Sequence, residues 1–252
     1  MKLIPTALGW GTRAIEEDSM QRKFVRLTLV PMVVLVAARL VPAQDAKTLY
    51  PAMAPVNQYM IADRNTEIAL ARSAAPKSIS DQAEILVLGE HGYETAVKGT
   101  NGFVCVVERS WTAGADAPDF WNPKVRSPFC LNAQAVETYL PLTIMKTNLA
   151  LAGKSKTELV AGIEAALDEK KLPPIGRGAM CYMMSKQGYL NDAGGHWHPH
   201  LMFFAPSTKP DAWGANLDDS PIVAVADTED RITIFMVPLS RWSDGTPDSD
   251  AH

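Results

Sequence analysis

The sequence YETAVKGTNGFVCVVER at residues 93–109 carries the strongest fold signal in the chain. Tyr93 to Lys98 mixes polar and apolar residues, and Gly102 to Arg109 contains the run Phe-Val-Cys-Val-Val, which is typical of a buried strand. The connection Gly99-Thr100-Asn101-Gly102 contains an Asn-Gly pair, which readily adopts the positive φ angles of a tight turn. The segment therefore predicts a β-hairpin with its turn at Asn101-Gly102.

Further helices and strands are predicted on both sides of this hairpin. Capping residues and composition predict helices over residues 63–74, 132–152 and 155–167, the second of them kinked or restarted at Pro141. Short apolar runs predict strands over residues 84–88, 179–185, 201–204, 222–226 and 231–237, with a last hairpin turn at 227–230. Residues 111–128 are predicted to form a loop. Strands, then helices, then strands predict an α+β fold: an antiparallel sheet with two to three helices.

Residues 20–43 have the order of a secretory signal peptide. Three basic residues, Arg22, Lys23 and Arg26, precede the uncharged run Leu27 to Ala38, and Ala43 supplies a small residue at the cleavage point. The run is shorter than the roughly 20 apolar residues of a spanning helix, so we expect no stable membrane insertion after cleavage. An N-terminal membrane anchor or an amphipathic core helix remains the alternative.

The residues that precede this signal do not fit it. Glu16, Glu17 and Asp18 are acidic, whereas the start of a signal peptide is basic. We therefore expect translation to start at Met20, with residues 1–19 an extension that does not belong to the protein. Cleavage leaves residues 44–58 as an N-terminal arm, 59–242 as a single α+β domain and 243–252 as a flexible tail.

The composition excludes several classes of protein. Hydrophobic residues make up 47% and charged residues 21%, so the chain is not a disordered one. A formal net charge of −4 argues against nucleic acid as a partner. Three cysteines are too few for a disulfide-dense scaffold, although Cys105 and Cys130 are the best candidates for one disulfide in an oxidising compartment. A buried free thiol at Cys105 is the alternative.

The clearest chemical signal is the segment Gly-Gly-His-Trp-His-Pro-His at residues 194–200. His196, His198 and His200 alternate, and alternate side chains share a face in an extended chain. Imidazole is the commonest metal ligand near neutral pH, so we expect a divalent transition metal, zinc or copper, at this segment. Ligands at i and i+4 of a straight strand lie about 13 Å apart, so His196 and His198 are the best pair unless the segment curves.

Several other residues are weaker candidates for the same site. Cys181 precedes the histidines on a predicted strand and could add a thiolate ligand, although burial in the core explains it better. Glu90 and His91 are candidates for a catalytic acid–base pair, with a solvated turn as the alternative. Trp197 and Tyr189 are candidates for contact with a substrate, which is a small molecule or a polymer of unknown identity.

Taken together, these patterns predict an exported protein, periplasmic or secreted, that binds a metal. The sequence lacks Gly-x-Ser-x-Gly, His-Glu-x-x-His and Gly-x-Gly-x-x-Gly, which argues against the common serine hydrolases, zinc peptidases and dinucleotide enzymes. A zinc- or copper-dependent hydrolase or oxidoreductase is therefore one expectation. The alternative is a non-catalytic exported protein with a ligand-binding or structural role, whose histidines act without a metal or form a packed ladder.

Overall fold

The computed structural model describes residues 49–194 and 197–249. The predicted extension (1–19) and signal peptide (20–43) therefore lie outside the described residues, as does His196. All of the described residues belong to one compact unit.

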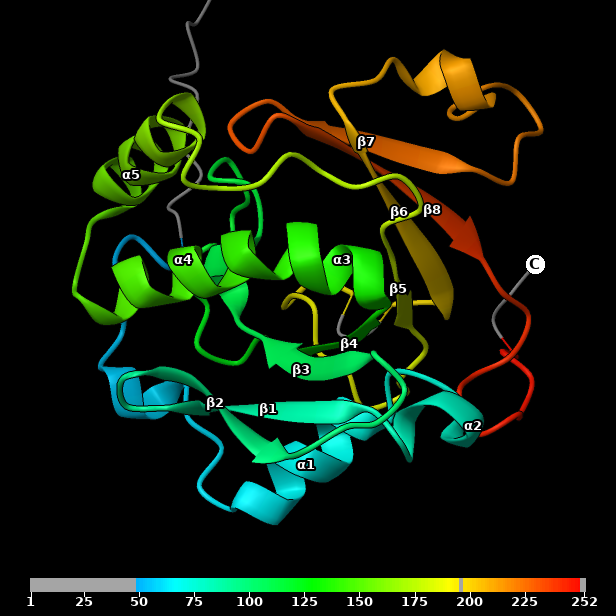
Figure 1. The fold of residues 1–252 in the computed structure, drawn as a ribbon, viewed down its shortest axis with the longest axis horizontal. Coiled ribbons are helices and arrows are strands. Elements are labelled where there is room, and N and C mark those ends of the chain that lie inside the picture. The colour runs from blue at the N-terminus through cyan, green and yellow to red at the C-terminus, as the bar shows by residue number, and fades with distance from the viewer. Residues whose placement is uncertain (1–48, 195–196, 250–252) are drawn as a thin grey trace, which may run out of the picture. The chain divides into compact units, whose positions relative to one another are not determined.

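Within the described ranges, one sheet of eight strands organises the fold (Figure 1). Across the sheet the strands are β2 (Gly92–Val97), β1 (Glu84–Gly89), β3 (Val104–Glu108), β4 (Ser127–Leu131), β5 (Met180–Met183), β6 (His200–Pro206), β8 (Ile232–Pro238) and β7 (Val223–Asp227). β1 and β3 run parallel, and the other neighbouring pairs run antiparallel. The α+β class is confirmed, but the sheet is mixed, so the expected purely antiparallel sheet is wrong.

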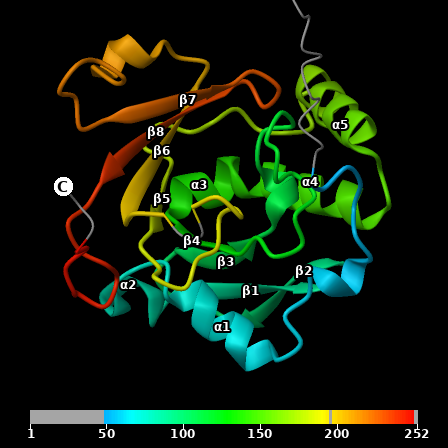
Figure 2. The same ribbon diagram turned by 180° about the vertical axis from the view of Figure 1, so that it is seen from behind.

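The described residues also form more helices than the two to three expected. They are α1 (Arg64–Arg72), α2 (Lys77–Ser80), α3 (Ala133–Thr138), α4 (Leu140–Leu151) and α5 (Lys156–Asp168). The helices α1 and α2 lie on one side of the β1–β3 part of the sheet, and α3 and α4 lie on the other (Figures 1 and 2). Successive side chains of β3 point to opposite faces of the sheet, and both faces are covered. Val106 packs with the core under α3, α4 and α5, and Val107 packs with the core beneath α1.

The predicted hairpin at Asn101-Gly102 is wrong. The hairpin of this region joins β1 to β2 through Glu90 and His91, and β3 lies on the other side of β1. β3 is buried along its whole length and takes a central position, whereas the more exposed β2 forms an edge. Gly99 to Gly102 instead carries the chain across β1, where a Cβ on Gly99 would lie 2.1 Å from the backbone nitrogen of Glu84.

The predicted helix signals are found in the structure. The Asn132 side chain accepts a hydrogen bond from the Ala135 amide at the start of α3, and Pro141 lies in the first turn of α4 after a break at Tyr139. Ser155 and Glu158 form the expected capping box of α5. Among the described residues, no helix is long and apolar enough to cross a membrane.

Two contacts fix the middle and one edge of the sheet. Cys105 of β3 and Cys130 of β4 are directly opposite each other and are joined by a disulfide. At the β7 edge, the side-chain amide of Asn216 accepts a hydrogen bond from the Ala224 amide at 2.9 Å and donates one to the Ala224 carbonyl at 2.8 Å. Asn216 thereby occupies backbone groups that a further strand would use.

Candidate metal site

The described part of the histidine segment leads into β6. His200 is the first residue of β6, where it pairs with Met183 of β5 and Pro238 of β8. The preceding Pro199 is buried, and its carbonyl accepts a hydrogen bond of 2.8 Å from the Leu239 amide. The segment is therefore held between two strands, which fixes the backbone from which His198 and His200 project.

His198 is hydrogen-bonded to a carboxylate far away in the sequence. Its Nδ1 lies 2.7 Å from Oδ2 of Asp248. The Asp248 side chain is 2% exposed and the His198 side chain 56% exposed, so a buried acid orients an imidazole that reaches the surface. The amide of Asp248 bonds to the Ser240 carbonyl at 3.0 Å, so this stretch packs against the domain where a flexible tail from residue 243 was expected.

His200 is held through the same ring atom. Its Nδ1 lies 2.7 Å from the carbonyl oxygen of His198, and burial lowers the pKa of its imidazole. A carbonyl can only accept, so Nδ1 of His200 carries the hydrogen and Nε2 carries the lone pair when the ring is neutral. The Nδ1 atoms of His198 and His200 are thus both hydrogen-bonded within the protein, and no partner for the Nε2 atom of either ring is found among the described residues.

The two aromatic residues expected to contact a substrate, Trp197 and Tyr189, both make contacts within the protein. Trp197 is buried, and a Cβ added to Gly188 would lie 2.3 Å from its ring, so the indole packs directly on that glycine. Tyr189 donates its hydroxyl hydrogen to Asp192, which also accepts from Tyr50 and, at 3.1 Å, from Lys124. These hydrogen bonds hold the pKa of the Asp192 carboxyl well below its usual range and keep it charged.

The other candidates lie elsewhere. Glu90 and His91 are exposed in the β1–β2 turn, and β3, β4 and β5 separate these strands from β6. Cys181 is buried in the core opposite Met202, and burial raises the pKa of its thiol. Within residues 49–194 and 197–249, no three His, Cys, Asp or Glu side chains converge as a metal site. A metal ion held by His198 and His200 would therefore need further ligands from outside this set of described side chains.

The structure contains two buried ion pairs that the sequence did not predict. Arg109 donates to the Tyr59 and Val107 carbonyls and forms a buried ion pair of 2.8 Å with Glu67. On the α4 side of the sheet, Lys146 forms a second buried ion pair with Asp230. These residues are far apart in the sequence, and single charged residues in helices and turns resemble ordinary surface residues until the fold is known.

Next to the second ion pair, Glu108 accepts a hydrogen bond of 2.9 Å from the Thr143 hydroxyl. Burial raises the pKa of Glu108 to about 7 and that of Asp230 to about 6. Both carboxyls therefore titrate well above the usual range for acidic side chains.

Comparison of the chain with protein-family models, with curated proteins and with solved structures found no match.

Proposed function

We propose that this chain is an exported protein that binds a zinc or copper ion through the segment His196-Trp197-His198-Pro199-His200. One observation supports the proposal above the others: the Nδ1 atoms of His198 and His200 are hydrogen-bonded to a buried carboxylate and to a backbone carbonyl. Histidines that ligate metals usually have this second contact, which fixes the tautomer and leaves Nε2 to the ion.

The donor chemistry favours a transition metal over calcium or magnesium. Neutral imidazole nitrogens suit zinc and copper, whereas hard cations prefer oxygen ligands. His198 and His200 are two residues apart, a spacing that lets two rings reach one ion, and His196 continues the same alternation. An ion with only these protein ligands retains a coordination position for water or substrate.

Such a site suits either hydrolytic or oxidative chemistry. A bound zinc ion would lower the pKa of its water toward neutrality, whereas copper would support oxidation. In either case the role of Asp248 is to hold His198 in one orientation. On the loop that leads to the histidines, Tyr189 and Asp192 provide polar groups, and Asp192 also accepts hydrogen bonds from Tyr50 and Lys124.

Export is the second part of the proposal. It rests on the basic and then apolar order of residues 20–43, and the Cys105–Cys130 disulfide is compatible with an oxidising compartment.

Elemental analysis of the full chain, purified without an affinity tag and dialysed against zinc or copper, tests the metal site. We expect about one ion per chain in the natural protein and in the control variant His91→Ala, whose imidazole is exposed at the distant β1–β2 turn. The variant His198→Ala should lose most of the ion. Absence of stoichiometric metal in the natural protein, or equal metal in His198→Ala, would overturn the proposal.

A further inference from the structure

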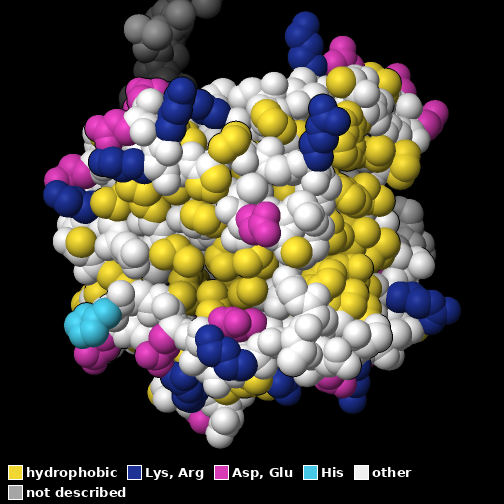
Figure 3. Space-filling model, viewed as in Figure 1, with side chains coloured by type: hydrophobic (Ala, Val, Ile, Leu, Met, Phe, Trp, Pro, Cys, Tyr) yellow, Lys and Arg dark blue, Asp and Glu magenta, His cyan; other side chains and the backbone are white. Residues whose placement is uncertain are grey.

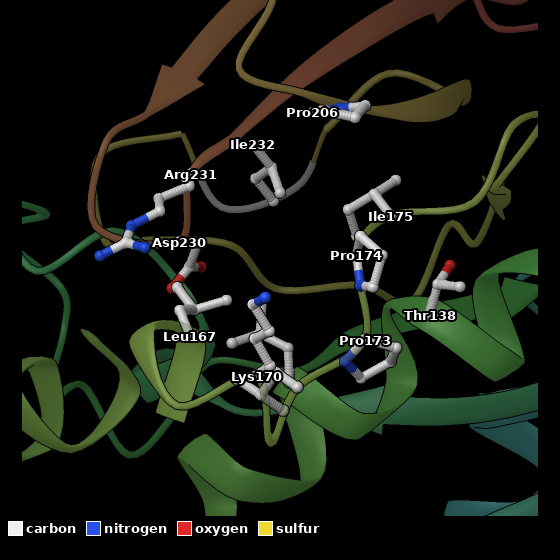
Figure 4. Close-up of a pocket in the computed structure, with 12 residues that line it drawn as sticks. Thr138, Leu167, Lys170, Pro173, Pro174, Ile175, Pro206, Asp230, Arg231 and Ile232 are labelled. Atoms are coloured by element: carbon white, nitrogen blue, oxygen red, sulfur yellow. The ribbon is translucent and has the colours of Figure 1, made fainter. Parts of the chain in front are cut away.

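A cavity of about 510 Å³ opens between the segment that follows α5, the helix α4 and the strands β6 and β8 (Figure 4). Its volume lies in the range of small-molecule sites. Most of its wall is apolar and is formed by Leu142, Leu167, Leu172, Pro174, Ile175 and Ile232. Figure 3 shows that hydrophobic side chains extend over much of this face of the molecule, with Lys and Arg side chains around them.

Lys170 provides a cation in this apolar setting. It lies in the cavity wall, and its side chain points into the space between Leu167 and Pro174 (Figure 4). No carboxylate lies within 4.0 Å of its ammonium group among the described residues, whereas the neighbouring Lys171 is paired with Glu169 at 2.5 Å. Lys170 is exposed, so its ammonium lies at the solvent-facing mouth of the cavity, where it can pair with the charged end of an anionic ligand.

The backbone shows that the two cations of the wall stand where glycine is usual. Lys170 has a φ of 57° directly after α5, and Arg231 has a φ of 56° at the end of the β7–β8 turn. Side chains other than glycine are strained in this region. The backbone amide of Lys170 donates to the Leu167 carbonyl, and the backbone amide of Lys171 donates to the Ala166 carbonyl. Helix ends with this pair of hydrogen bonds usually have glycine at the position of Lys170.

The one acid in the wall does not repel an anion strongly. Asp230 is paired with Lys146, and burial raises its pKa to about 6. Its other oxygen, Oδ1, has no hydrogen-bond partner among the described residues, but this atom is fully buried and a ligand in the cavity cannot reach it. Arg231 also lies in the wall and donates to Asp168 at 2.6 Å.

We infer that this cavity binds a small amphipathic carboxylate, an aliphatic acid of medium chain length. The hydrocarbon part lies against the leucine, proline and isoleucine side chains of the wall, and the carboxylate pairs with the Lys170 ammonium. This ligand matches both the apolar wall and the unpaired Lys170 ammonium. An uncharged hydrocarbon would match only the apolar wall, and a cationic amine would be repelled by Lys170. The site is independent of the histidines at the start of β6.

Calorimetric titration of the full chain with sodium decanoate, below the concentration at which it forms micelles, tests the inference. Decanol and decyltrimethylammonium serve as uncharged and cationic comparisons. We expect decanoate to bind most tightly, Lys170→Gln to weaken it about tenfold, and Lys170→Arg to retain it. Lys171→Gln is the matched control and should bind normally, because Lys171 is paired with Glu169.

Three outcomes would overturn the inference. They are no binding of decanoate, equal binding of decanol, and tighter binding of the cationic probe. Equal affinity of Lys170→Gln and the natural protein would also overturn it, and unfolding curves of both variants would show that each is folded.

Discussion

The Nδ1 atom of His198 and the Oδ2 atom of Asp248 form a hydrogen bond of 2.7 Å between residues that are 50 positions apart in the chain. Through this bond the C-terminal segment orients a ring at the start of β6. Two elements that are separate in sequence are thereby joined at the proposed metal site.

Replacing Asp248 by Asn should weaken zinc binding by about 10- to 100-fold, because the amide holds the imidazole less firmly and lowers its basicity. Competition with a chromophoric chelator measures the affinity. Asp244→Asn is the matched control, since Asp244 lies in the same segment but pairs with Lys186 at the surface. Equal zinc affinities for both variants would contradict a supporting role for Asp248.

Replacing Arg109 by Met should lower the free energy of unfolding by about 3–5 kcal/mol, because Glu67 would be left buried and charged without its partner. Arg64→Met removes the exposed pair with Glu94 and should change the same quantity by at most about 1 kcal/mol. Urea titration followed by tryptophan fluorescence gives both values. Similar losses in the two variants would show that burial of the Arg109 pair carries no special weight.

The raised pKa of Glu108 predicts that stability falls as pH rises from about 4.5 to about 7. In this window the native carboxyl keeps a proton that the unfolded chain releases, so the free energy of unfolding falls by up to about 1.4 kcal/mol per pH unit and levels off above pH 7. Asp230, with a pKa of about 6, acts in the same direction. The variant Glu108→Gln should show a clearly smaller slope in urea titrations at a series of pH values.

The control for this pH series is Glu158→Gln, which alters the capping box of α5. Hydrogen bonds from Ser155 lower the pKa of Glu158 to about 2, so the variant should lose the same amount of stability at every pH between 5 and 8. If Glu108→Gln kept the slope of the natural protein, Glu108 would not be the group responsible.

Reduction of the Cys105–Cys130 disulfide should lower the free energy of unfolding by about 3 kcal/mol, because the bond closes a loop with a sequence separation of 25. Urea titrations with and without a reductant compare the reduced and oxidised proteins, which have the same side chains and differ only in this bond. The free thiol of Cys181 is present in both states and serves as an internal control. Coincident unfolding curves would mean that the bond contributes nothing.

Lys170→Gly should stabilise the protein by about 1 kcal/mol, since glycine adopts the φ of 57° without strain. Thermal unfolding measures the change, and Lys171→Gly, one residue further along, should give no such gain. A loss of stability in Lys170→Gly would show that the lysine side chain itself supports the end of α5.

Local signals predicted the helices well. Asn132, Pro141 and the Ser155–Glu158 pair mark boundaries that depend on hydrogen bonds within a few residues, and the structure has them at these positions. The pairing of β3 could not be predicted in the same way. An Asn-Gly turn tells which residues bend, but the partner of a strand depends on which surfaces remain to be buried, and β3 is buried on both faces.

For the candidate site, too, the local signals could be predicted from the sequence and the contacts between distant residues could not. The alternation of the histidines was visible in the sequence, but Asp248 was not, because an acid in a polar C-terminal stretch gives no sign of being buried. Lys146 and Asp230 are likewise brought together only by the packing of α4 against the β7–β8 turn. Contacts of this kind join residues that are far apart in the sequence and look like ordinary surface residues there. They depend on the fold and cannot be recognised from one sequence.

The amide of Asn216 has a consequence for how copies of this protein behave at high concentration. The strand that it covers carries exposed valines, Val223 and Val225, which would otherwise favour templated addition of a second molecule. By hydrogen-bonding both backbone groups of Ala224, Asn216 blocks the pairing of a further strand at that residue. Association of two molecules through this edge is therefore disfavoured at Ala224.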